Sequence, residues 1–113
     1  MRYVIVPTQD FKRNFKRLAK KYHSLDDDYE VFTNELQKNP TMGDQLGMNA
    51  YKVRMAIASK GGGKRGGARI ITCLVLVDVE NSEIYLLTMY DKGEFDTVSK
   101  EGVKSLKKEA GLS

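Results

Sequence analysis

A nearly unbroken run of apolar residues, Ala68 to Val77, constrains the fold of this chain more than any other segment. A strand with one open face alternates polar and apolar residues, whereas a strand buried on both faces reads as a continuous apolar run. We therefore expect this run to be the central strand of a sheet that is covered on both faces. Its one cysteine, Cys73, is expected to be a buried and unreactive thiol.

Three further strands are predicted around this run. From Tyr51 to Ala58, apolar residues alternate with Lys52, Arg54 and alanines. Period two places Lys52 and Arg54 on the same open face, about 7 Å apart. The chain then turns over residues 78–83 and returns as a strand over residues 84–90, and a short strand over residues 3–6 ends at Pro7.

Two amphipathic helices are predicted before Pro40. The first, from about Thr8 to Tyr22, has an apolar face made of Phe11, Phe15, Leu18, Ala19 and Tyr22. Its opposite face carries six cations and no acid: Lys12, Arg13, Lys16, Arg17, Lys20 and Lys21. The second helix is predicted to have Ser24 as its N-cap, with Asp27 three residues later, and to end at Asn39-Pro40. Its apolar face is made of Leu25, Tyr29, Phe32 and Leu36.

The remaining segments complete a prediction for the whole fold. Residues 41–49 and 91–95 are expected to be loops, and Ser99 to about Glu109 a helix that packs through Val103 and Leu106. The predicted fold is α+β with the order βααβββα, a single domain over residues 1–113. A helical hairpin is expected on one face of a small antiparallel sheet.

A glycine-rich basic segment joins the two central strands. Residues 61–67 hold five of the ten glycines together with Lys64 and Arg65, and no acid lies between Lys52 and Arg69. The Gly-Gly-Lys sequence is not a nucleotide-binding loop, because Arg65 stands where Ser or Thr would hold the metal and a strand follows instead of a helix. A mobile basic tip that contacts nucleic acid is favoured over a tip that only aids solubility.

The residue inventory limits the chemistry. One histidine, His23, and one cysteine leave no metal site and no Ser-His-Asp or Cys-His arrangement, so Lys, Arg and Tyr must carry any catalysis. RNA supplies its own nucleophile, the 2′-hydroxyl. A lysine whose pKa is lowered by neighbouring cations can deprotonate that hydroxyl, and arginines can clamp the phosphate. A ribonuclease that needs no metal or other cofactor is therefore chemically coherent.

Composition and charge agree with such a partner. The formal net charge is +4, and no stretch is long and apolar enough for a membrane span. The apolar run at residues 3–6 is too short for a signal peptide, so we expect a cytoplasmic protein.

Four segments together resemble the RelE/ParE superfamily of bacterial toxins from type II toxin–antitoxin systems. These segments are FKRNFKRLAKKYHSL, LQKNPTMGDQL, YKVRMAIASKGGGKRGGARIITCLV and IYLLTMYDKGEFDTVSKEGVKSL. The resemblance spans nearly the whole chain, and the βααβββα order is similar to the fold of that family. It implies a toxin whose partners are a cognate antitoxin, mRNA and the ribosome, and the RelE branch implies cleavage of mRNA in the ribosomal A site.

The resemblance also implies roles for individual residues. Lys52 and Arg54 match two basic strand positions, a base and a clamp, and Arg69 matches a phosphate-stabilising arginine. Lys92 falls near a basic residue that assists leaving-group protonation, and Tyr90 and Phe95 are the aromatics available for stacking. We expect the surrounding cations to bind RNA: Lys60, Lys64, Arg65, Lys12 and Lys16.

The chain departs from the family pattern in two places. It has no Tyr just beyond Lys92 and no C-terminal His. Two other functions remain open: a ParE-type inhibitor that binds DNA gyrase, and a degenerate member that binds only its antitoxin.

Overall fold

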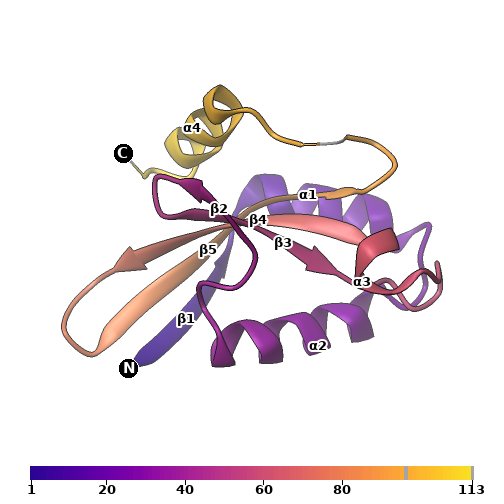
Figure 1. Ribbon diagram of the computed structural model, residues 1–113, viewed down its shortest axis with the longest axis horizontal. Helices are drawn as coiled ribbons and strands as arrows, with labels where there is room; N and C mark the ends of the chain where they lie inside the picture. Colours follow the sequence, from indigo (N-terminus) through magenta and orange to yellow (C-terminus); the bar gives the residue numbers. More distant parts are fainter. Residues whose placement is uncertain (96, 113) are drawn as a thin grey trace.

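A five-stranded sheet forms the centre of the molecule in a computed structural model, which describes residues 1–95 and 97–112 (Figure 1). Its strands are β1 (Arg2–Pro7), β2 (Asp44–Gly47), β3 (Ala50–Met55), β4 (Ala68–Leu76) and β5 (Asn81–Asp91). They lie in the order β1-β5-β4-β3-β2. Every neighbouring pair is antiparallel except β1 and β5, which are parallel. The sheet was expected to be antiparallel but is mixed. The two helices that follow β1 carry the chain back along the sheet before the next strand begins, and β1 pairs in parallel with β5.

Within residues 1–95 and 97–112, the helices that accompany the sheet are α1 (Gln9–Ala19), α2 (Leu25–Lys38), α3 (Gly63–Gly66) and α4 (Lys100–Glu109). Apart from the short β2 and the single-turn α3, the order is βααβββα, so the predicted α+β fold is confirmed. The helical pair α1 and α2 packs on the sheet, as expected.

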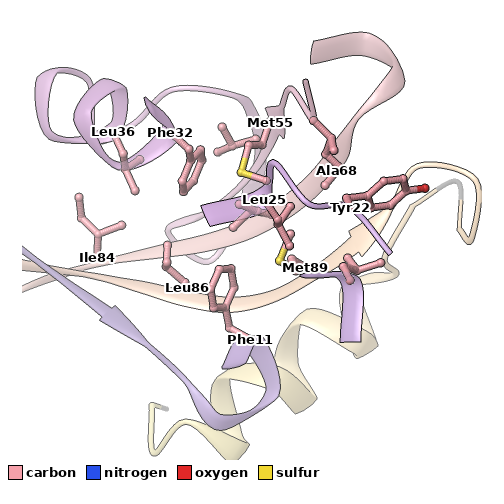
Figure 2. Packing of buried hydrophobic residues seen from close by; sticks show 14 residues of the cluster. Phe11, Tyr22, Leu25, Phe32, Leu36, Met55, Ala68, Ile84, Leu86 and Met89 are labelled. Atoms are coloured by element: carbon pink, nitrogen blue, oxygen red, sulfur yellow. The ribbon is translucent and has the colours of Figure 1, made fainter. Parts of the chain in front are cut away.

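The main core lies between this helical pair and one face of the sheet. Phe11 of α1 and Phe32 and Leu36 of α2 meet Leu86 and Met89 of β5, all at most 3% exposed (Figure 2). These residues come from the apolar faces that helical spacing predicted. Burial of such aromatic and aliphatic side chains is the main source of stability for a domain of this size.

The opposite face of the sheet carries a second, smaller cluster. Ile71, Cys73, Leu87 and Tyr90 are buried there, and Leu106 of α4 packs against them. The predicted central strand is confirmed, because β4 lies in the middle of the sheet and residues 68–73 are all buried. Cys73 is buried, as predicted.

A short hairpin occupies part of the predicted loop at residues 41–49. β2 pairs with β3 through a tight turn at Met48 and Asn49, whose φ angles are 56° and 60°. A two-residue hairpin turn of type I′ has positive φ at both central positions, and glycine or asparagine usually marks them. Asn49 fits this pattern but Met48 does not, and β2 was not predicted.

Several predicted element ends also differ from the structure: α1 ends at Ala19 and not near Tyr22, and β5 begins at Asn81, inside the predicted turn. β3 ends at Met55 and not at Ala58. Ser24 precedes α2 but does not cap it with its side chain. Its hydroxyl instead donates to Asp28 at 2.6 Å and accepts from the Ser59 N–H at 2.9 Å. The serine ties the start of α2 to the segment after β3, and this long-range contact outcompetes the local cap.

Candidate nucleic-acid interface

The pairing of β3 with β4 brings three predicted cations onto one face of the sheet. Arg54 lies directly opposite Arg69, and Lys52 lies opposite Ile71. Residues opposite each other on antiparallel strands point to the same face. Lys52, Arg54 and Arg69 therefore share the face that α4 covers further along the sheet, where Ile71 is buried.

A surface depression collects three cations from β3 and α3. Lys52, Arg54 and Lys64 line a hollow of about 380 Å³, together with Met42, Gly43, Asp44 and Val53. One acid, Asp44, is among the lining residues. It is the residue of β2 that lies opposite Lys52 in the register of β2 and β3. This hollow has the excess positive charge and the open shape that a phosphate needs.

Arg69 is placed differently from the other two strand cations. It is 7% exposed, and its guanidinium donates to the carbonyl oxygens of Lys64 (3.2 Å), Arg65 (3.0 Å) and Ala68 (3.2 Å). Two of these bonds reach carbonyls of α3, and the Lys64 carbonyl also accepts a hydrogen bond from the Gly67 N–H at 3.4 Å. In this structure Arg69 holds the glycine-rich segment and does not line the hollow.

The glycine-rich segment, which was predicted to be a mobile basic tip, contains the single helical turn α3. Gly62 precedes α3 with a φ of 80°. Gly67 follows it and lies so close to β3 that a Cβ there would be 2.0 Å from the Met55 carbonyl oxygen. On α3, the Lys64 ammonium is 2.5 Å from a carboxylate oxygen of Glu35, and the Arg65 side chain is exposed.

Lys60 faces a buried carboxylate. Its ammonium lies 2.6 Å from Asp91, which also accepts hydrogen bonds from the Tyr22 hydroxyl (2.5 Å) and the Gly93 N–H (3.2 Å). Burial alone would raise the pKa of Asp91, but the bonds from Lys60 and Tyr22 outweigh it and lower that pKa to about 2. The predicted RNA contact of Lys60 would have to compete with this ion pair.

The predicted residues of the β5 end lie next to this network. Tyr90 is 3% exposed, and its ring contacts Phe95 edge to face at 5.6 Å between centroids. Burial raises the pKa of the Tyr90 phenol, and the charge of Arg69 partly opposes that effect. Phe95 is 59% exposed and is open to a stacking partner. Lys92 has an exposed side chain, while its N–H donates to the Gly67 carbonyl.

The basic face of α1 is partly neutralised. Lys12 and Lys16 are exposed, as a role in steering RNA requires. Arg13 lies 3.3 Å from Asp10, and Arg17 lies 2.7 Å from Glu94. Asp10 precedes Arg13 by three residues on the same helix, so the description of this face as free of acids was wrong; Glu94 comes from a distant loop and carried no such signal.

Two acids beside the cations were missed by the sequence reasoning. Asp44 lay in a predicted loop, and Glu35 lay on a helix as an ordinary surface residue, so neither carried a signal.

Within residues 1–95 and 97–112, no three His, Cys, Asp or Glu side chains come together in a way that could hold a metal ion. None of the helices in that same part of the chain is long and apolar enough to cross a membrane. No protein-family model matches the chain.

Proposed function

We propose that this protein is the toxin of a type II toxin–antitoxin system, similar to RelE, and that it cleaves mRNA on the ribosome without a metal ion. The observation that carries the proposal is the hollow lined by Lys52, Arg54 and Lys64, with no more than one acid among its lining residues. The cations that the family resemblance singles out on β3 line it, and β4 brings Arg69 alongside.

Each residue has a distinct part in the proposed reaction. Lys52, in its neutral form, takes the proton from the 2′-hydroxyl, and the 2′ oxygen then attacks the adjacent phosphorus. The bond from phosphorus to the 5′ oxygen breaks, which leaves a 2′,3′-cyclic phosphate and a 5′-hydroxyl. Arg54 binds the phosphate oxygens, where charge accumulates in the transition state. Lys92, in its charged form, supplies the proton to the leaving 5′ oxygen.

Arg69 and the outer cations support this chemistry. Arg69 keeps α3 in place, and α3 presents Lys64 and Arg65 to the RNA backbone. Lys12 and Lys16 add to the positive field that attracts RNA and ribosome. A cognate antitoxin with an acidic segment would cover the same surface by charge complementarity.

Induced expression without a partner tests the proposal. We expect translation to stop and new mRNA 5′ ends to appear within coding regions, mapped by primer extension. Lys52→Ala and Arg54→Ala should each lower cleavage by roughly a hundredfold or more, since acid–base and electrostatic contributions have that size. Lys38→Ala, an exposed lysine at the end of α2, is the matched control and should cleave as the wild type does.

Two results would contradict the proposal. Intact mRNA together with DNA-damage signalling would indicate gyrase inhibition instead. Growth that continues normally despite soluble, folded protein would indicate a chain that only binds its antitoxin.

A further inference from the structure

One ion pair sits inside the cationic surface and has no part in the proposed chemistry. The Lys64 ammonium on α3 lies 2.5 Å from the Glu35 carboxylate on α2. Lys64 lines the hollow of about 380 Å³ with Lys52 and Arg54. It also lines a smaller neighbouring hollow of about 110 Å³, where Arg54 and Glu35 are both present. Glu35 therefore places a negative charge beside the two cations that would bind a phosphate.

This ion pair is easily opened. The Lys64 side chain is 52% exposed and the Glu35 side chain 36% exposed. Pairs so accessible to water contribute little to stability. A phosphate that reaches the site gains hydrogen bonds to charged donors, and an arginine can bind it through two parallel bonds. Replacing the carboxylate with a phosphate therefore costs little stability.

The exchange needs only side-chain motion. Three hydrogen bonds from Arg69 hold the backbone of α3 and the residues beside it. The other acid in the smaller hollow, Asp28, is committed elsewhere, because its carboxylate accepts hydrogen bonds from Ser24 and from the Ala58 N–H. Unlike Asp28, Glu35 forms its ion pair with a residue, Lys64, that is itself a candidate RNA contact.

We infer that the Glu35 carboxylate occupies the position of an RNA phosphate between Lys64 and Arg54, and that RNA must displace it to bind. This inference rests on the proposed function and adds a regulatory feature to its site. In the free protein, Glu35 neutralises Lys64. This ion pair lowers the affinity of Lys64 for anions that cannot contact Arg54 at the same time.

The test is RNA binding by the intact protein, measured by fluorescence anisotropy with a single-stranded RNA whose riboses are 2′-O-methylated and cannot be cleaved. Glu35→Gln should bind about 1.5-fold to fivefold more tightly at low salt, the range expected for loss of one exposed ion pair.

Glu30→Gln is the matched control. Glu30 is exposed on the same helix, and within the described part of the chain its carboxylate has no hydrogen-bond or ion-pair partner. Glu30→Gln and Glu35→Gln change the net charge by the same amount. A comparison of the two variants therefore removes the general effect of charge. In a Lys64→Gln background, Glu35→Gln should have no effect beyond that of Glu30→Gln.

The outcomes separate the inference from the proposed function. If Arg54→Ala binds RNA as the wild type does, the proposed function is wrong and the inference falls with it. If Arg54→Ala weakens binding but Glu35→Gln matches Glu30→Gln, only the inference is overturned. Weaker binding by Glu35→Gln would also overturn it, because Glu35 would then position Lys64 for RNA.

Discussion

The side-chain hydroxyls of Thr8 and Thr72 differ in hydrogen bonding. The Thr8 hydroxyl donates to the carbonyl oxygens of Leu86 and Leu87, at 2.9 and 3.1 Å, and caps α1 by accepting from the Phe11 N–H in its first turn. The Thr72 hydroxyl is fully buried and has no hydrogen-bond partner among the described residues. A buried hydroxyl without a partner costs free energy that a methyl group of similar size does not.

Valine at each position should therefore have opposite effects on stability. We expect Thr72→Val to raise the free energy of unfolding by about 1 kcal/mol, because it removes the desolvated hydroxyl. Thr8→Val should lower it by about 1–2 kcal/mol, because it removes a helix cap and two long-range hydrogen bonds. Urea denaturation of both variants checks the signs, and a loss of stability in Thr72→Val would contradict the first expectation.

The segment between β3 and β4 was the least predictable element. The sequence marked it as glycine-rich and basic, and the cations on the flanking strands fall on one face as alternation predicted. The helical form of α3 depends on Arg69, whose side chain returns to carbonyls four and five residues earlier. Local spacing could not show whether that guanidinium points to solvent, to a phosphate or to the backbone.

Gly67 allows the start of β4 to lie very close to the end of β3, beside α3. A Cβ at this position would lie 2.0 Å from the Met55 carbonyl oxygen, well inside van der Waals contact. Gly67→Ala should push the strands apart and cost about 1–3 kcal/mol of stability, the usual range for overpacking. Gly93→Ala is the control, since its Cβ would meet nothing closer than 3.9 Å and should leave the unfolding midpoint nearly unchanged. Equal midpoints for the two variants would show that the strands adjust without cost.

At the scale of the whole molecule, one buried carboxylate joins three distant segments. Asp91 at the end of β5 binds Tyr22 from the α1–α2 junction and Lys60 from the segment after β3. Its pKa is lowered from 3.8 to about 2. A group whose pKa is lower in the folded state stabilises that state above its unfolded pKa, and the contribution disappears as the pH falls through its folded pKa.

Asp91 should therefore contribute about 2 kcal/mol of stability at neutral pH, lost between about pH 4 and pH 2. Asp91→Asn should unfold at lower urea concentration at pH 7, and its difference from the wild type should shrink as the pH falls towards 3. The exposed Glu80→Gln is the control, with the wild-type profile expected. A difference that stays constant with pH would mean that packing, and not charge, makes Asp91 important.

The sequence alone determined the classes of element and most of their order. Apolar periodicity identified the two helices, and the unbroken run at residues 68–77 identified the central strand, because these patterns follow directly from which faces must be buried. Alternation also placed Lys52 and Arg54 on one face. These conclusions need only local geometry and hydrophobicity.

Tertiary structure decided how distant segments meet. It made β1 parallel to β5, formed β2 on a turn that places Met48 at positive φ, and brought Glu35, Glu94 and Asp91 to the cations that they neutralise. A cation's partner depends on side chains tens of residues away, and their separation in space is fixed only when the sheet and helices pack. The sequence therefore located the positive charge of this protein, and the fold determined which of its cations lie beside a carboxylate.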